Sequence, residues 1–172
     1  MFDKPIFILA KKTAFVLFFC TVALMITARV LNYRLMIDSQ PEHSMYYRVG
    51  IGHIHHIDEF HRGDLIVFIP GHGEMAGMFM DRMTTKMVGG VPGDKLTVKD
   101  GVFSINGKEY GKMEILDRAV KYMHRDAKSF DREEIVPPGK LLVVGTEKVS
   151  FDSRYWGFLY QDSVIGDIAP IY

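Results

Sequence analysis

Hydrophobic residues are concentrated near the start of the chain, in one run without charge. Residues 13–28 contain no Asp, Glu, Lys or Arg. With Val30 and Leu31 the run reaches the ~20 residues that an apolar helix needs to cross a bilayer. Arg29 lies inside the extended run, where a long side chain can place its charge at the interface. The pattern predicts a membrane-spanning helix that ends near residue 31.

The charges that flank this run indicate its orientation. Lys4, Lys11 and Lys12 precede it, and the positive-inside rule then places the N-terminus in the cytoplasm. We therefore expect residues 1–31 to form a cytoplasmic N-terminus with an anchor, and residues 32–172 to form a domain outside the cytoplasm. A cleaved signal peptide is the alternative, but residues 26–28 read Ile-Thr-Ala, a poor small-x-small cleavage site.

Apolar runs beyond residue 40 are short and are separated by Gly, Pro and Asp. Four of them have the length and composition of β-strands, at residues 65–69, 95–98, 102–105 and 141–144. Asp100-Gly101 and Asn106-Gly107 predict type I′ hairpin turns on either side of the third run. Only residues 113–125 suggest a helical turn or two. The chain therefore predicts a mostly β, antiparallel domain behind one transmembrane helix.

Length, charge and cysteine content narrow the class of protein. A chain of 172 residues suits one modest domain plus an anchor. Its formal net charge of +0 provides no global field to attract nucleic acid, so no nucleic-acid partner is expected. Cys20 is the one cysteine, which excludes a disulfide within the chain.

Lys86 is a candidate general base. A serine hydroxyl is a poor nucleophile until a base takes its proton, and lysine can do so only when neutral, although its free pKa is about 10.4. Burial among uncharged groups lowers a lysine pKa, and residues 83–85 and 87–88 are uncharged. Spacing alone, however, favours a surface lysine beside the turn-rich residues 89–94.

Three segments, taken in chain order, resemble the type I signal peptidases, which are serine–lysine proteases. Ser44 is followed by Met45, as in the family's Ser-Met pair. Lys86 precedes Asp94 by eight residues, and residues 90–94 supply a Gly-x-Pro-Gly-Asp motif. Residues 150–157 read Ser-Phe-Asp-Ser-Arg-Tyr-Trp-Gly and match the family signature Ser-x-Asp-Ser-Arg-x-x-Gly throughout. The resemblance implies a signal-peptidase-like antiparallel β catalytic domain.

The resemblance also implies a role for each matching residue. Ser44 would be the nucleophile, and its backbone N–H would be one donor to the oxyanion. Lys86 would be the general base, and the Ser150 hydroxyl would hydrogen-bond its amine. Asp152 and Arg154 would form a supporting ion pair. No cofactor or metal is expected. The expected partners are an exported precursor protein and the lipid bilayer of a bacterial inner membrane, with the catalytic domain in the periplasm.

The chain departs from the family pattern at several positions. Many members have, two residues before the nucleophile, a serine that completes the oxyanion hole, and this chain has Glu42, which cannot donate when ionised. A backbone group, a protonated Glu42 or His43 must then be the second donor. The usual proline after the Ser-Met pair is absent, residues 145–148 read Gly-Thr-Glu-Lys, and the insert at about 95–139 is short.

These departures suit the peptidases of conjugative-transfer systems, which mature pilin precursors and in some cases join the pilin termini head to tail. The favoured function is therefore a membrane-anchored Ser-Lys endopeptidase acting on an exported precursor, with a conjugative pilin as the expected substrate. A general secretory signal peptidase is one alternative. A catalytically inactive assembly factor is another, which Glu42 favours and the retention of Ser44, Lys86 and Ser150 opposes.

A group of histidines has the density of a metal site, together with two acidic residues: His53, His55, His56, His61, Asp58 and Glu59. Its spacing matches no zinc motif. A solvated polar loop is the favoured interpretation, and a weak regulatory metal site is the alternative.

Several further residues have candidate roles outside these motifs. Ser39 is an alternative nucleophile, although it lies closer to the membrane span and lacks the Met partner. Tyr155 and Trp156 are expected to pack beneath the active site, with contact to the bilayer surface as the alternative. Apolar residues that could line a substrate groove are Val49, Ile51 and Phe79.

Overall fold

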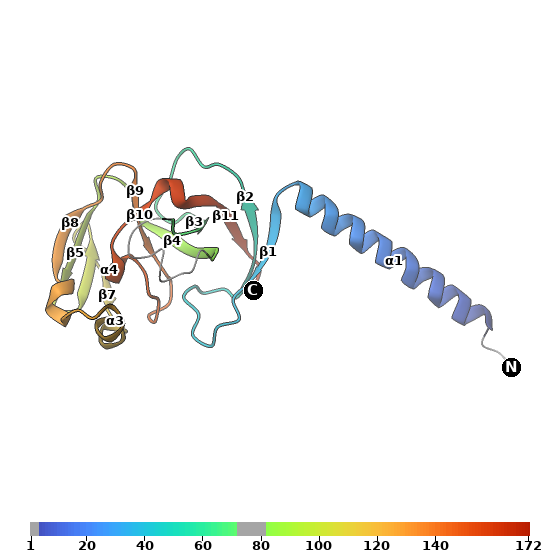
Figure 1. The fold of residues 1–172 in the computed structure, drawn as a ribbon, viewed down its shortest axis with the longest axis horizontal. Coiled ribbons are helices and arrows are strands. Elements are labelled where there is room, and N and C mark those ends of the chain that lie inside the picture. The colour runs from blue at the N-terminus through green and yellow to red at the C-terminus, as the bar shows by residue number, and fades with distance from the viewer. Residues whose placement is uncertain (1–3, 72–81) are drawn as a thin grey trace. The chain divides into compact units, whose positions relative to one another are not determined.

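The computed structural model describes residues 4–71 and 82–172 of the chain. The chain divides into two compact units, one ending at Arg34 and the other covering Leu35–Tyr172. The first unit contains a long helix, and the second is built mainly of strands (Figure 1). The predicted fold class, mostly antiparallel β with an N-terminal apolar helix, is therefore confirmed.

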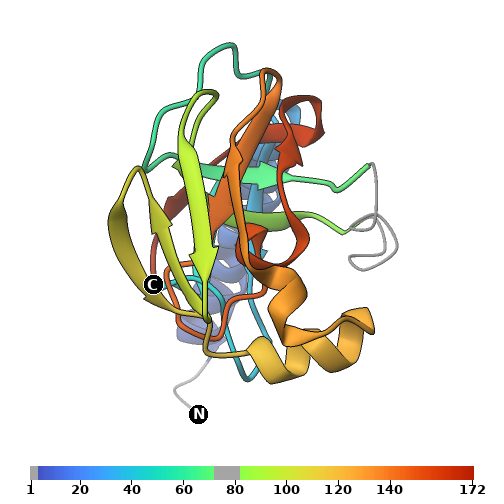
Figure 2. The ribbon, with the colours of Figure 1, turned by 90° about the vertical axis from the view of Figure 1, so that its left-hand side faces the viewer.

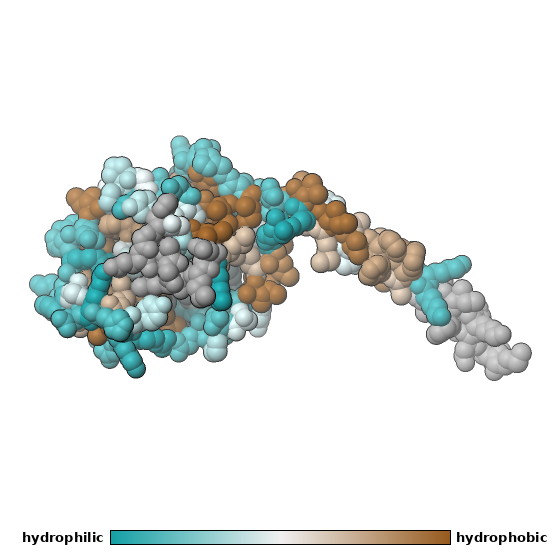
Figure 3. All heavy atoms as spheres, viewed as in Figure 1, coloured by the Kyte–Doolittle hydropathy of each residue, from teal (hydrophilic) through white to brown (hydrophobic). Residues whose placement is uncertain are grey.

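Helix α1 (Lys4–Val30) contains the uncharged run of the sequence. Its segment Lys11–Val30 has a mean hydropathy of 2.0 and is long and apolar enough to cross a membrane. None of that segment is buried inside the protein, and its apolar side chains are visible in Figure 3. Arg29 lies in the last turn, where a positive charge complements the helix dipole. The apolar surface of Lys11–Val30 is thus exposed, unlike that of a core helix.

The strands form two sheets, and from β2 onward every neighbouring pair is antiparallel. The larger sheet has the order β1-β2-β11-β3-β4-β9-β10. Its strands are β1 (Tyr33–Ile37), β2 (Val49–Ile54), β3 (Leu65–Phe68), β4 (Thr84–Gly90), β9 (Lys140–Val144), β10 (Leu159–Tyr160) and β11 (Val164–Pro170). The smaller sheet has the order β7-β6-β5-β8. Its strands are β5 (Lys95–Lys99), β6 (Val102–Ile105), β7 (Lys108–Lys112) and β8 (Arg132–Ile135).

Short helices connect the later strands, namely α3 (Leu116–Met123), η1 (Ala127–Phe130), α4 (Ser153–Trp156) and η2 (Gln161–Ser163). Figure 2 shows α3, in gold, at one end of the β unit. Its apolar residues, such as Leu116 and Ala119, pack against the hydrophobic core. The predicted helical turns within residues 113–125 are therefore confirmed by α3.

The main hydrophobic core takes residues from both sheets. Ile66 and Val88 enter it from the larger sheet, and Leu96 and Ile105 enter it from the smaller one. A second, smaller core contains Met45, Tyr47, Val67 and Ile168. In β5 and β6, buried and less buried residues alternate, as expected of strands with one face on a core. The two cores hold the segments that carry the candidate catalytic residues.

The predicted hairpins are confirmed. Strand β6 pairs with β5 on one side and β7 on the other. Asp100, Gly101, Asn106 and Gly107 all have positive φ angles, from 49° to 78°. A type I′ turn requires positive φ at both central residues, which Asn, Asp and Gly tolerate best.

Two further outcomes concern residues near the expected site. Tyr155 and Trp156 are buried in the main core, which confirms the packing interpretation. Strand β4 was not predicted, because Thr-Thr-Lys-Met-Val-Gly-Gly does not alternate clearly between apolar and polar residues. It becomes a strand because β3 and β9 pair with both of its edges.

Candidate active site

Strand β4 places Lys86 in the interior of the β unit. Lys86 lies opposite Ile66 of β3, and it is only 3% exposed. The interpretation of Lys86 as a surface lysine beside a turn is therefore wrong. The turn comes only after the strand has ended, at residues 92–93. Lys86 therefore lies within a strand that is paired on both edges.

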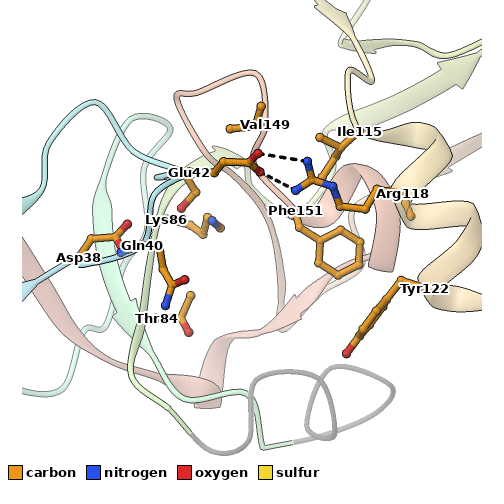
Figure 4. A pocket seen from close by; sticks show the side chains of 12 residues that line it. Asp38, Gln40, Glu42, Thr84, Lys86, Ile115, Arg118, Tyr122, Val149 and Phe151 are labelled. Carbon is orange, nitrogen blue, oxygen red and sulfur yellow. Dashed lines mark hydrogen bonds and ion pairs between the residues drawn. The ribbon is translucent and has the colours of Figure 1, made fainter.

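Lys86 and Ser44 line the same cavity, which has a volume of about 370 Å³. Much of its wall is apolar, formed by Ile115, Ala119, Tyr122, Val149 and Phe151. Polar groups complete it, from Asp38, Gln40, Glu42, Thr84 and Arg118. Figure 4 shows Lys86 between the side of the cavity that carries Asp38 and Gln40 and the side that carries Phe151. The two residues predicted to carry the chemistry are thus brought together.

The surroundings of Lys86 favour its neutral form. Burial is the main cause and lowers the pKa of Lys86 from its ordinary value of 10.5 to about 8. The charge of Asp152 opposes this change, Arg154 assists it, and Asp38 opposes it. A lysine with a pKa near 8 is partly neutral around neutral pH and can accept a proton there.

Ser44 is held in place by contacts between two loops. Its carbonyl oxygen accepts a hydrogen bond of 3.2 Å from the N–H of Glu147. The next residues are fixed as well, because Met45 is buried in the smaller core and the Tyr46 N–H donates to Thr146 Oγ1 at 2.6 Å. Within the described residues the Ser44 N–H donates no hydrogen bond. That N–H is therefore available to an oxyanion.

Gly145 lies where Ser44 and Ser150 approach each other. A Cβ atom at this position would lie 2.1 Å from Ser150 Oγ and 2.3 Å from the Ser44 carbonyl oxygen. Both distances are far below van der Waals contact, so that only glycine fits without movement of its neighbours. The family signature around Ser150 and the Ser-Met pair thus meet in space at Gly145, the first residue of the segment 145–148 that departs from the family pattern.

Ser150 is completely buried, and its Oγ atom has no hydrogen-bond partner among the residues that the structure describes. The predicted hydrogen bond from this hydroxyl to the Lys86 amine is therefore not formed here. The hydroxyl lies against Gly145 instead. An unsatisfied buried hydroxyl costs about 1–3 kcal/mol, and in catalytic sites such bonds often tighten only when substrate binds.

The ion pair between Asp152 and Arg154 is formed and is buried, with the two side chains 0% and 4% exposed. Asp152 accepts hydrogen bonds from Arg154 Nε at 2.7 Å, from Arg154 Nη2 at 2.5 Å and from the Gly145 N–H at 2.7 Å. The Arg154 guanidinium also lies 4.9 Å from the centre of the Phe103 ring. The pair therefore fixes the loop that carries Gly145 and Ser150.

A second ion pair, which the sequence did not reveal, joins Arg62 and Asp94. Asp94 is buried and also accepts hydrogen bonds of 2.8 Å from the Val91 N–H and from Asn106 Nδ2. The hydrogen bond from Arg62 is the main reason why the pKa of Asp94 is lowered to about 2. The Asp of the Gly-x-Pro-Gly-Asp motif therefore secures the turn between β4 and β5 and lies outside the cavity.

Glu42 forms an ion pair with Arg118 at the cavity (Figure 4). The two hydrogen bonds measure 2.5 Å and 3.3 Å, and they lower the pKa of Glu42. A protonated Glu42 is therefore disfavoured as the second oxyanion donor. His43 does not line the cavity, and its Nδ1 lies 3.1 Å from the Arg48 guanidinium, which can only donate. A neutral His43 then carries its proton on Nε2.

Other sequence candidates lie elsewhere. Val49 and Ile51 belong to β2 and do not line the cavity, and neither does Ser39. Phe79 lies outside the described residues. The apolar cavity wall comes instead from α3 and from the segment around residue 150, which sequence patterns did not connect with Lys86.

The predicted histidine cluster divides into three parts. His53 and His55 lie near Asp167 of β11, whereas His56 and His61 lie near Asp58 and Asp64. The interpretation as a solvated loop suits the exposed His56. The sequence pattern did not indicate the contact with Asp167 of β11, because Asp167 is remote in sequence from the cluster.

Comparisons with known proteins place this arrangement in a family. Residues 8–172 match the family described as signal peptidase, peptidase S26. Because the match covers nearly the whole chain, this protein belongs to that family. Membership and the apolar helix near the N-terminus together fit a membrane-anchored protein.

Individual relatives agree with the family match. The chain is 31% identical over 106 residues to a protein named Probable signal peptidase I-2 from Synechocystis sp., which covers 61% of this chain and 44% of that protein. It is 29% identical over 119 residues to signal peptidase I of Bacillus caldolyticus, covering 65% and 61%. It is 28% identical over 123 residues to signal peptidase I V of Bacillus subtilis, covering 67% and 68%. The chain thus spans about half of the first two relatives.

Among solved structures, a signal peptidase I from Enterococcus faecalis V583 is similar, with a TM-score of 0.40 and 24% sequence identity. The similarity covers 66% of this chain and 99% of that chain.

Proposed function

We propose that this protein is a membrane-anchored serine endopeptidase that removes leader peptides from exported precursor proteins, with Ser44 and Lys86 as its catalytic dyad. The observation that carries the proposal is the shared cavity, in which Ser44 lies with a buried lysine whose pKa is lowered to about 8. A surface lysine could not act as a base near neutral pH. Membership of the signal peptidase family supports the same conclusion.

The reaction begins when neutral Lys86 accepts the proton of the Ser44 hydroxyl. The Ser44 oxygen then forms a bond to the scissile carbonyl carbon, and the carbonyl oxygen becomes an oxyanion that the Ser44 N–H stabilises. When the intermediate collapses, the C–N bond breaks and the Lys86 ammonium gives its proton to the leaving amine. Water, activated by the same lysine, releases the acyl group.

Supporting residues keep these groups in position. Asp152 and Arg154 hold the loop that carries Gly145 and Ser150, and that loop contacts Ser44. Ser150 is buried next to Gly145 and helps to keep the Gly145 backbone in position beside Ser44. The second oxyanion donor would be a backbone N–H or His43, because Arg118 keeps Glu42 ionised.

The cavity indicates the kind of peptide that would bind. Its apolar wall, with Ile115, Val149 and Phe151, suits small or apolar side chains next to the scissile bond. Binding in an extended conformation would let backbone hydrogen bonds align the carbonyl carbon with Ser44.

A conjugative pilin is the proposed precursor, with the anchor in a bacterial inner membrane and the β unit in the periplasm. The short insert, Glu42 and the missing proline after Met45 support this subtype over a general secretory peptidase. Lys11 and Lys12 before the apolar segment support the orientation. If a peptide amine rather than water attacks the acyl-enzyme, the product is a head-to-tail circle.

The experiment is intact mass spectrometry of a pilin precursor incubated with the protein in membranes, beside Ser44→Ala. A truncated product that needs Ser44 supports the peptidase. A product whose mass is lower than that of the truncated linear product by one water molecule identifies cyclisation. Cleavage of many unrelated secretory precursors instead would identify a general signal peptidase.

A serine-reactive acylating probe separates a wrong substrate from an inactive protein. Labelling of the wild type, with none of Ser44→Ala, supports a working nucleophile even when the chosen precursor is not cleaved. No labelling of either protein, together with an unchanged precursor, would contradict the proposal and favour an inactive assembly factor.

A further inference from the structure

Three potential ligand groups meet on the larger sheet, away from the Ser44 cavity. His53 of β2 lies directly opposite Asp167 of β11, so that both side chains are on the same face of the sheet. His55 follows just after the end of β2, and its ring stacks on that of His53, with the two centroids 4.5 Å apart. Figure 1 shows β2 and β11 side by side. One ligand atom from each of the three side chains lies within 4.8 Å of the others.

The hydrogen bonds of His55 determine which of its nitrogens faces this group. Its Nδ1 lies 2.7 Å from the His56 carbonyl oxygen. A carbonyl oxygen can only accept, so Nδ1 carries a hydrogen and donates it. In the neutral ring Nε2 then has a free electron pair. Metal-binding histidines commonly show this arrangement, with one ring nitrogen donating to a carbonyl group and the other on the metal.

The free electron pair of His55 Nε2 faces a carboxylate. Nε2 and Asp167 Oδ2 are 3.4 Å apart, a separation that either a proton on Nε2 or a cation shared by the two atoms stabilises. Two ligands at about 2.05 Å from a tetrahedral ion are about 3.3 Å apart, given usual Zn–N and Zn–O bond lengths. The spacing of this pair therefore fits a shared ion, and His53 supplies a third ligand atom within 4.8 Å of the other two.

We propose that His53, His55 and Asp167 bind one transition-metal dication of the Zn²⁺ type, with water in the remaining position. Imidazole and carboxylate ligands suit this class of ion, whereas Ca²⁺ and Mg²⁺ prefer sites made only of oxygen ligands. A cavity of about 470 Å³, lined by His55, Asp64 and Asp167, gives solvent and ions access to the group.

The bound ion would join β2 to β11. Strand β11 pairs on its other side with β3, where Ile66 lies opposite both Asp167 and Lys86. The site thus lies on the same sheet as Lys86 and two strands away from its strand. We expect the ion to stabilise the sheet, while the chemistry stays at Ser44.

The test is isothermal titration of Zn²⁺ into the purified full-length protein in detergent, without a histidine tag and after chelator treatment. We expect one ion per chain. His55→Ala, His53→Ala and Asp167→Asn should each weaken binding by more than about 100-fold, because loss of even an outer partner of a metal ligand costs about 10–100-fold. His56→Ala is the matched control, since His56 is an exposed neighbour whose Nε2 lies 3.3 Å from Asp58.

Thermal unfolding with and without Zn²⁺ provides a second readout. The wild type and His56→Ala should unfold at a higher temperature with Zn²⁺, and the three ligand variants should not respond. Labelling of Ser44 should be equal in all five proteins, which shows that they are folded. The proposal is overturned if Zn²⁺ does not bind, if His56→Ala loses binding as His55→Ala does, or if Asp167→Asn binds as tightly as the wild type.

Discussion

Lys86 and Lys128 are two lysines of the β unit whose pKa values move in opposite directions. Lys128 is exposed and lies 2.8 Å from Asp100 and 2.7 Å from Asp131, and these carboxylates raise its pKa. Lys86 is buried, and the loss of water lowers its pKa to about 8. Lys128 is thus held charged and cannot be a base, whereas Lys86 can be one.

The difference shows that the burial of Lys86, which lowers its pKa, comes at a cost to the stability of the fold. Below pH 8 Lys86 is charged in both the folded and the unfolded state, and burial makes this charge less favourable in the folded protein. The free energy of unfolding is lowered by this difference. The penalty is fully present there, decreases as the pH rises from about 8 to 10.5, and vanishes above 10.5. Exposed ion pairs such as that of Lys128 avoid this penalty, but they add little to stability.

The largest expected effect comes from Lys86→Met, which keeps the side-chain length and removes the base. The rate of Ser44 labelling should fall by about 10²–10⁴-fold, the usual contribution of general base catalysis. The free energy of unfolding at pH 7 should rise by about 3 kcal/mol, from 1.36 kcal/mol for each unit between 10.5 and about 8. Urea unfolding, followed by the fluorescence of the buried Trp156, measures it.

Lys128→Met is the matched control for that experiment. It should leave labelling unchanged and should not stabilise the protein, because it removes an exposed, paired lysine. A loss of stability in Lys86→Met at pH 7, or a gain that persists above pH 10.5, would contradict the assigned environment of Lys86.

Asp152→Asn should have the next largest effect. It leaves the buried Arg154 without its carboxylate, and breaking a buried pair costs about 3–5 kcal/mol. In folded Asp152→Asn protein the pKa of Lys86 should be lower than in the wild type, because the charge of Asp152 raises the pKa of Lys86. The pH midpoint of Ser44 labelling should then move to a lower pH. A midpoint that moves upward would show that Asp152 does not act on Lys86 in this way.

Gly145→Ala should perturb both sides of the site. Its new methyl group would overlap Ser150 Oγ and the Ser44 carbonyl oxygen, and overpacking of this kind typically costs about 1–3 kcal/mol. Labelling of Ser44 should slow together with the loss of stability. Gly71→Ala serves as a control, since no atom of the described residues 4–71 and 82–172 lies within 4 Å of its Cβ position. Equal behaviour of the two variants would refute the close contact at Gly145.

Glu42→Gln should have the smallest effect. Glu42 and Arg118 are an exposed pair, so we expect labelling and substrate affinity to change by no more than about fivefold. A loss above 100-fold in kcat, measured with a cleavable precursor, would give Glu42 a part in the chemistry that its ionised state does not support.

Local sequence signals predicted the helix and the hairpins of this fold. The uncharged run became α1, and the Asp-Gly and Asn-Gly pairs became turns between β5, β6 and β7. These features depend on neighbours in the chain. Strand β4 depends on β3 and β9, which lie elsewhere in the sequence, so its own residues did not reveal it.

The part of the candidate site that could be predicted from the sequence is the part that lies in family motifs. Ser44, Lys86 and the pair of Asp152 and Arg154 follow from the family resemblance. The salt bridge of Glu42 joins residues 76 apart in the chain, and the cavity at Lys86 is lined by α3 and by the segment around residue 150. Such contacts follow from tertiary packing, which no local pattern encodes.

The role of Lys86 as the base is tested most directly by the rate of covalent Ser44 labelling by an acylating probe, measured by intact mass between pH 6 and pH 11. We expect the labelling rate to rise with pH, with a midpoint near pH 8, the pKa of the buried Lys86. Lys128→Met should give the same curve. A midpoint near the ordinary lysine value of 10.5, or a rate that does not depend on pH, would contradict Lys86 as the base.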